Sequence, residues 1–180
     1  MLKASNTTKL TISGVLLAVG MLLPFLTGQI PEIGSRLSPL HLPVLLCGFI
    51  CGWKYGMAVG FVLPLMRSMI FGMPLMMPHA SAMAVEMAVY GAVTGLVYDK
   101  LPKTTVSIYL SLVAAMLCGR LVWGVASAFL YGVSGNAFSV QIFIAKGFLD
   151  AIPAIILQLI LIPFLVISIN RSKVFDTVRA

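Results

Sequence analysis

Charged residues are scarce in this chain of 180 residues. Only 9% of the residues are charged and only five are acidic, whereas 60% are apolar. A mean hydropathy of +1.06 and repeated long apolar runs are typical of an all-α polytopic membrane protein. We therefore expect one transmembrane domain over residues 1–180, with no room for a separate soluble domain.

Cysteine is also rare, and its three occurrences do not form a disulfide framework. Cys47 and Cys51 lie four residues apart, on one helical face, and Cys118 is alone in another apolar segment. A metal ion would require more ligands nearby, and the sequence offers none there. We expect small buried core residues at all three positions, and neither a metal nor a cofactor.

Several functional motifs are missing. The sequence has no Gly-x-x-x-x-Gly-Lys-Ser/Thr phosphate loop, so the chain does not hydrolyse ATP by that route. The net charge of +7 comes without a basic stripe interleaved with aromatic residues, which argues against nucleic-acid binding. No group of histidine, carboxylate or metal-ligating residues has the composition of a catalytic centre, so we do not expect an enzyme.

Turn residues and charges divide the apolar sequence into six expected spans. A modest turn signal, Cys51–Gly56, separates the short second and third spans, and one kinked segment is the alternative there. No clean cleavage site follows Lys3 and Lys9, so the first span is expected to be retained rather than removed as a signal peptide. The spans are Thr11–Thr27, Leu40–Trp53, Met57–Phe71, His79–Tyr98, Thr105–Tyr131 and Val140–Ile169.

The distribution of basic residues indicates the orientation. Six crossings place eight of the twelve basic residues on one side, which the positive-inside rule assigns to the cytoplasm together with both termini. Five crossings would put Arg171, Lys173 and Arg179 outside, against that rule. The eight residues are Lys3, Lys9, Lys54, Lys100, Lys103, Arg171, Lys173 and Arg179.

Five charged residues lie inside the expected spans, where a charge costs roughly 2.5–3.5 kcal/mol. They are Arg67, Glu86, Arg120, Lys146 and Asp150. At about 1.5 Å per residue, all five fall within roughly 17 Å of the outer membrane surface, and they come from four spans. This common depth predicts a single polar pocket that opens outward.

Further polar and aromatic residues surround this predicted pocket. We expect His79 and Asn136 to cap it, Trp123 to form a wall, and His41 to hold the first outer loop at the entry of the second span. Simpler explanations remain open. Arg67–Glu86 and Lys146–Asp150 are equally well explained as structural ion pairs, His79 as an interfacial side chain, and Trp123 as core packing.

The charge balance of the predicted pocket points to the ligand. Three cations against two anions leave one positive charge unmatched, and burying it without a partner would be costly. A small carboxylate is a natural partner for such a charge.

One catalytic motif has to be weighed separately. Gly132-Val133-Ser134-Gly135 matches the Gly-x-Ser-Gly signature of rhomboid-type intramembrane proteases. Such a serine needs a histidine base, which in that family comes from a later helix, but His41 and His79 both precede it. The motif also falls in an expected outer loop, so we interpret it as ordinary turn composition.

The stretch Leu37–Phe49, with its continuation through Gly52, Gly56, Gly60-Phe61 and Pro64-Leu65 to Arg67, resembles the substrate-binding (S) component of energy-coupling factor (ECF) vitamin transporters. This resemblance implies a multi-pass protein of the bacterial cell membrane. Such a subunit captures a vitamin from outside and delivers it through a coupling membrane subunit and two cytoplasmic ATPases. The whole-chain pattern is most similar to the pantothenate-type branch. Hydroxymethylpyrimidine, pyridoxine-like or niacin-type cargo remains an alternative, and the few aromatics disfavour riboflavin and cobalamin.

The family's docking signature in the first helix is Ala-x-x-x-Ala, and this chain has Gly14 and Ala18 at that spacing instead. Small residues four apart allow close helix approach, so we expect these two to contact the coupling subunit. The alternative function is an ion-coupled secondary transporter of a small organic anion. Such transporters are usually larger and show inverted repeats, which are not visible here.

Overall fold

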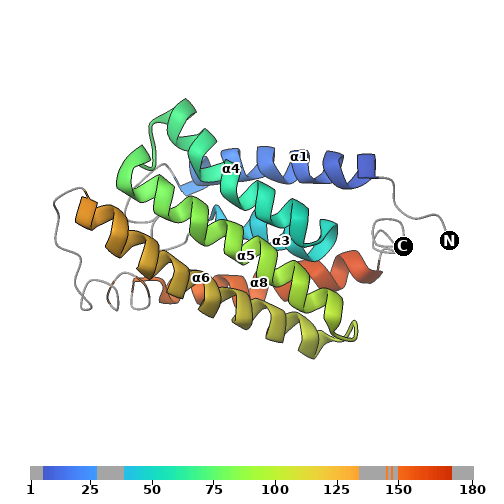
Figure 1. Ribbon diagram of the computed structural model, residues 1–180. Coiled ribbons are helices and arrows are strands. Elements are labelled where there is room, and N and C mark those ends of the chain that lie inside the picture. The colour runs from blue at the N-terminus through green and yellow to red at the C-terminus, as the bar shows by residue number, and fades with distance from the viewer. Residues whose placement is uncertain (1–5, 28–38, 134–144, 146, 148–149, 172–180) are drawn as a thin grey trace.

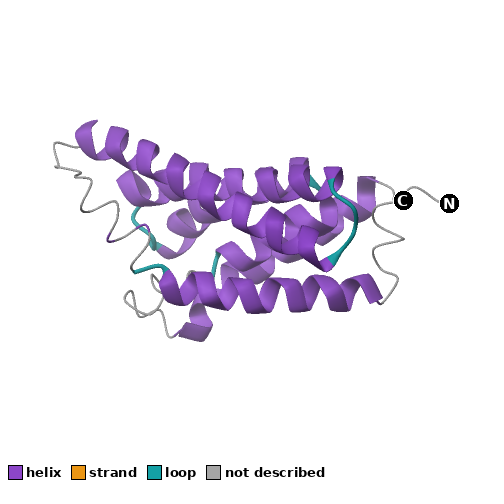
Figure 2. Ribbon diagram, turned by 90° about the horizontal axis from the view of Figure 1, so that it is seen from below, coloured by secondary structure: helices purple, strands orange, loops and turns teal. Residues whose placement is uncertain are grey.

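A computed structural model describes residues 6–27, 39–133, 145, 147 and 150–171 of the chain, and these residues contain helices and no strand. The α-helices are α1 (Asn6–Leu22), α3 (His41–Cys51), α4 (Trp53–Phe71), α5 (Ser81–Lys100), α6 (Thr105–Val133) and α8 (Ile152–Arg171). A 3-10 turn, η1 (Leu23–Thr27), extends α1, and a π-type turn, η2 (Met76–Ala80), leads into α5. Figure 2 shows this all-helical architecture from below.

The short helix α3 lies in the interior of the bundle (Figure 1). It packs against α1, α4, α5 and α8, and all but one of its residues are buried. A helix that is apolar all round belongs in the core, because it has no face that favours water. The one polar residue of α3 is His41, its first residue. His41 is also buried, so its side chain contacts the surrounding helices.

The helices alternate in direction, so their connections gather at two ends (Figure 1). The start of α1, the α3–α4 and α5–α6 connections and the end of α8 lie at one end. The α4–α5 connection and the end of α6 lie at the other. Gly52 makes the α3–α4 turn with a φ of 93°, a backbone conformation that favours glycine. The second and third expected spans are therefore two helices and not one kinked segment.

Glycines bring α3, α4 and α5 close together. A Cβ atom added at Gly60 of α4 would collide with the backbone carbonyl of Met87 on α5. A Cβ at Gly91 of α5 would collide with the backbone of Gly56 in the same way. Gly48 of α3 also faces Gly91, with 2.7 Å between an added Cβ and the Gly91 carbonyl oxygen. The backbones thus touch, as small residues at helix interfaces allow.

One sequence expectation needs correction, and another is not tested. The last span is expected to begin at Val140; α8 begins at Ile152, but most of residues 140–149 lie outside the described part of the chain, so the start of that span stays a prediction. Cys118 was expected in the core, but its side chain is exposed, whereas Cys47 and Cys51 are buried as expected. A position on the outer face of α6 suits this apolar side chain in lipid, which explains why hydrophobicity alone misplaced it.

Among the described residues, length and composition qualify four helical segments to cross a membrane: Asn6–Phe25, Met76–Lys100, Thr105–Gly132 and Ile152–Asn170. Helix α3, with 11 residues, spans only about 16 Å. These segments confirm the membrane character of the chain.

Candidate substrate-binding site

Glu86 is at the centre of a buried polar cluster where three helices meet. Its carboxylate lies in the second turn of α5, and the residue is 1% exposed. Arg120 of α6 brings its Nη1 atom to 3.0 Å from Oε1 of Glu86. His41, at the start of α3, brings its Nε2 atom to 3.8 Å from the same oxygen. We call these three residues the Glu86 cluster.

The hydrogen-bonding capacity of this cluster is not used up. Arg120 is 8% exposed, yet its Nε atom donates no hydrogen bond to a described residue. Oε1 of Glu86 contacts Arg120 but accepts no aligned hydrogen bond, and buried Oγ of Ser127 also lacks a partner within the described ranges. Buried polar groups are normally satisfied. The unsatisfied Nε of Arg120 and the unsatisfied hydroxyl of Ser127 therefore mark a place where a polar ligand can bind.

Aromatic residues support the cluster. The rings of His41 and Tyr90 are 5.0 Å apart and nearly perpendicular, at 87°. Tyr90 lies one helical turn after Glu86 on α5, and its ring packs against Gly119 of α6, where an added Cβ would come within 2.8 Å of it. Trp123, one turn after Arg120, is buried. These contacts fix the orientation of His41 and hold α6 close to α5.

Sequence reasoning did not include Tyr90 and Ser127 among the site residues. The signal was present, because Tyr90 follows Glu86 by four residues and Ser127 follows Arg120 by seven, which are same-face helical spacings. Periodicity places such residues on the right face. It does not say which of them approaches a side chain of another helix.

Arg67 is buried apart from the Glu86 cluster. Its Nη1 atom donates a hydrogen bond of 2.6 Å to the carbonyl oxygen of Met21 near the end of α1. The guanidinium carbon lies 5.3 Å from the ring of Phe25 and 5.2 Å from that of Phe71. In the structure, then, the ion-pair partner of Glu86 is Arg120 and not Arg67. Arg67 instead joins the C-terminal part of α4 to the end of α1.

Replacing Arg67 by lysine tests this role. Lysine keeps the charge but loses the planar guanidinium that lies against both rings and reaches the Met21 carbonyl. We expect the melting temperature in detergent to fall by roughly 2–8 °C, since about 1–2 kcal/mol is lost and each kcal/mol is worth about 2–4 °C. Ligand affinity should change less than fivefold. A large loss of affinity at unchanged stability would instead place Arg67 in contact with the ligand.

The structure does not bring His79 and Asp150 into the Glu86 cluster. His79 lies in η2 and is exposed, and the side chain of Asp150 is exposed just before α8 begins. Asn136 and Lys146 lie outside the described residues, and so does the predicted Lys146–Asp150 pair. Within the described part of the chain, no group of three His, Cys, Asp or Glu residues could hold a metal ion.

The predicted docking residues lie on the outside of the bundle. Gly14 and Ala18 are both exposed on α1, and a Cβ added at Gly14 would meet nothing within 4 Å. Val15 and Val19, 57% and 41% exposed, lie beside them. Helix α1 therefore presents a smooth apolar surface away from the core.

Comparison with known proteins places these features in a family. Neither the curated proteins nor the solved structures give a match to this chain. The model of a family described as "ECF transporter, substrate-specific component" matches residues 8–169, nearly the whole chain. The chain therefore belongs to the substrate-specific components of ECF transporters: it is a membrane-embedded substrate-binding subunit of an importer that works with coupling and ATPase subunits.

Proposed function

We propose that this protein binds a small carboxylate vitamin, with pantothenate as the foremost candidate, at the Glu86 cluster. The observation that carries the proposal is the buried Arg120, whose Nε atom has no described hydrogen-bond partner while Nη1 is held by Glu86. A planar guanidinium can bind one carboxylate through one edge and a second carboxylate through another. Glu86 thus orients Arg120 toward a ligand anion.

The positions of two polar residues on one face of α6 support a ligand with polar groups at both ends. Ser127 lies two helical turns after Arg120 on the same face, about 10 Å away along the axis. Its buried, unsatisfied hydroxyl suits a hydroxyl or amide group of the ligand. Gly124, between them on this face, has no side chain, and the buried Trp123 lies next to it. A short chain with a carboxylate at one end and hydroxyl groups at the other fits this pattern.

The remaining predicted site residues keep proposed roles. We assign His79 and Asn136 to the outer cap of the site. Lys146 adds positive charge, with Asp150 orienting it from the turn before α8. Arg67 acts through its charge and by holding the outer end of α1. These assignments rest on sequence position, because the structure places His79, Asp150 and Arg67 away from Glu86 and does not describe Asn136 and Lys146.

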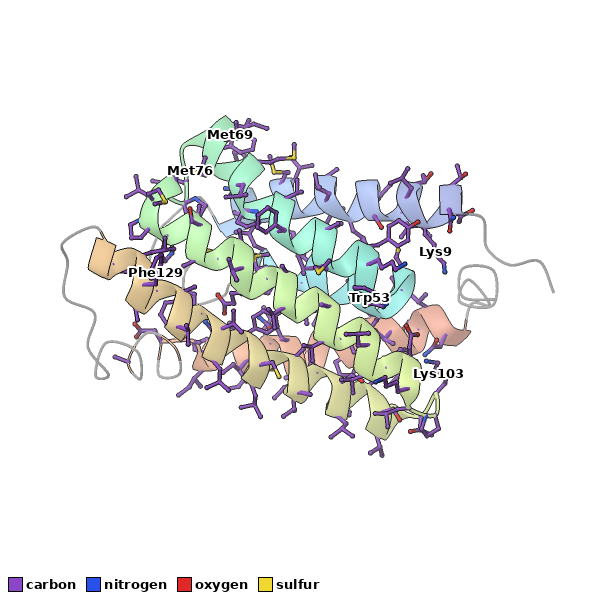
Figure 3. The ribbon with its side chains drawn as sticks, viewed as in Figure 1. Lys9, Trp53, Met69, Met76, Lys103 and Phe129 are labelled. Atoms are coloured by element: carbon purple, nitrogen blue, oxygen red, sulfur yellow. The ribbon has the colours of Figure 1, made fainter. Side chains whose placement is uncertain are left out.

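We also propose six membrane crossings with both termini in the cytoplasm. Lys9 and Lys103 lie toward the end of the bundle that holds the start of α1 and the end of α8 (Figure 3). Met69, Met76 and Phe129 lie toward the opposite end (Figure 3). This distribution agrees with the positive-inside rule. Helix α3, although short, is enclosed by other helices and does not have to match the bilayer alone.

Docking on the coupling subunit is proposed to use the exposed Gly14–Ala18 surface of α1. Replacing Gly14 by tryptophan should leave ligand binding by the isolated subunit within about twofold, because nothing packs on Gly14 within the bundle. Uptake by cells should fall at least tenfold, because a bulky side chain prevents close helix approach. Copurification of the ATPases with the variant measures the same step. Normal copurification and uptake would rule out this surface.

Calorimetry with the purified subunit, in the absence of ATPases, tests the proposed cargo. Pantothenate is titrated in parallel with pantothenol, its alcohol, in which a hydroxymethyl group replaces the carboxylate. Hydrogen bonds to charged groups contribute about 1.5–3 kcal/mol, so pantothenate should bind roughly 10- to 100-fold more tightly. Equal affinity for the two compounds would contradict carboxylate recognition by Arg120.

A further inference from the structure

The Glu86 cluster is electrically balanced before a ligand enters. Glu86 carries one negative charge and Arg120, at 3.0 Å, one positive charge. Both side chains are buried, so the surroundings screen them poorly. An anion that binds to the free edge of Arg120 would leave the Glu86 cluster with a net negative charge. The proposed Lys146–Asp150 pair does not change this balance, because its two charges cancel. Buried charges are normally compensated, so a compensating cation has to come from somewhere.

We propose that the protein captures its carboxylate ligand together with one proton, which binds to His41. This inference rests on the proposed function, because it requires an anion beside Arg120. The imidazole is the group placed to take the proton: its Nε2 atom is 3.8 Å from Oε1 of Glu86, and it is buried against the ring of Tyr90. Histidine is also the side chain that ordinarily changes charge between pH 5 and 8.

Apart from Glu86, the described charged and titratable groups around α3 do not offer this proton site. From α5, Glu86 and Tyr90 face His41, and Arg120 of α6 faces it through Glu86. Arginine stays protonated, so Arg120 cannot take up a charge, and the same holds for Arg67 of α4, which is bonded to Met21.

Helices α1 and α8 also pack on α3, but their described residues bring no group that could take up the proton near His41. Lys9 of α1 lies toward the opposite end of the bundle from the outer connections (Figure 3). Between Ile152 and Asn170, α8 carries no titratable side chain. Within the described part of the cluster, Glu86 is the rival acceptor of the proton, and a variant has to separate the two possibilities.

The thermodynamic linkage between proton binding and ligand binding gives the direction in which affinity changes with pH. If the complex holds a proton that the free protein lacks, affinity increases as pH falls and decreases as pH rises. Where His41 is neutral in the free protein and protonated in the complex, Kd should increase about tenfold per pH unit. The ligand carboxylate stays ionised from pH 6 to 8 and contributes no slope there. A neutral ligand needs no compensating charge and should bind with a flat pH profile.

The test is calorimetric titration of the full chain in detergent at pH 6.5–8, in buffers with different heats of ionisation. The buffer dependence of the binding heat gives the number of protons taken up. We expect a maximum of about one proton for pantothenate and none for pantothenol. The His41→Gln variant should bind pantothenate more weakly at pH 6.5, with no proton uptake and little pH dependence.

Each outcome has a definite meaning. Pantothenate binding without proton uptake would overturn the inference and leave the proposed function intact. Proton uptake that persists in His41→Gln would assign the proton to Glu86 and overturn the role of His41. No binding of pantothenate at any pH would refute the proposed cargo, and the inference with it. If the His41 variant does not fold, the comparison of pantothenate with pantothenol on the unaltered protein still decides whether a proton is bound.

Discussion

Replacing Arg120 by alanine should abolish ligand binding, with an affinity loss of at least 100-fold. The substitution removes the guanidinium that Glu86 orients and that is proposed to bind the ligand carboxylate. Losing a buried charge-assisted contact of this kind typically costs about 3–5 kcal/mol, which corresponds to 100-fold or more. Calorimetry on the purified variant measures the effect. The variant should still insert into the membrane, because α6 becomes more apolar.

The control for this experiment separates binding from folding. In Arg120→Ala the carboxylate of Glu86 is left buried without its ion-pair partner, which lowers stability. The double variant Arg120→Ala with Glu86→Gln removes that unpaired charge. It should melt closer to the unaltered protein than the single variant does, while still failing to bind. Affinity like that of the unaltered protein in either variant would refute the site.

Adding a single methyl group at Gly60 should destabilise the protein strongly. The Cβ atom of Gly60→Ala would collide with the backbone carbonyl of Met87, and a backbone cannot move aside as a flexible side chain can. Overpacking of this kind costs about 1–3 kcal/mol, which lowers the melting temperature of a chain of this size by roughly 2–12 °C. Gly91→Ala, whose Cβ meets the backbone of Gly56, should behave in the same way.

Gly14→Ala is the matched control, because it makes the same chemical change in a helix with open space around it. Alanine favours helices over glycine by about 1 kcal/mol, so this variant should melt at the same temperature or slightly higher. Similar stability of all three variants would mean that α4 and α5 are not in backbone contact. Thermal unfolding in one detergent, followed by circular dichroism, compares them directly.

The sequence predicted the helices better than the site. Apolar runs and turn residues located α1, α3, α4, α5 and α6 to within a few residues, because hydrophobic segment length is the dominant signal in a membrane chain. The glycine contacts between α4 and α5 were not predicted. Small residues are common in membrane helices, and spacing alone does not say which of them meet.

The candidate site was predicted in part. Depth along the helix axis correctly grouped Glu86 and Arg120 at similar levels, but depth carries no information about the direction in which a side chain points. Arg67 therefore seemed a natural partner of Glu86, whereas rotation of α4 directs it to Met21, Phe25 and Phe71. Asp150 was expected near the pocket from its depth in the last span, and its side chain is exposed just before α8 begins at Ile152.

His41 was predicted to hold an outer loop, and its approach to Glu86 was not foreseen. The two residues are 45 positions apart in sequence, and no local pattern connects them. The contact arises because α3 is enclosed by its neighbours, so its first residue is directed into the bundle. Such an arrangement is determined by tertiary packing and is not encoded in either segment alone.

The most direct measurement is native mass spectrometry of the subunit, expressed and purified without its coupling partners and with no ligand added. Substrate capture by this chain alone predicts a population carrying a bound small acid, with the mass of pantothenate foremost. Another small carboxylate would support the site and replace the proposed cargo. A clean ligand-free mass that stays unchanged after a panel of vitamins is added would contradict substrate capture at the Glu86 cluster.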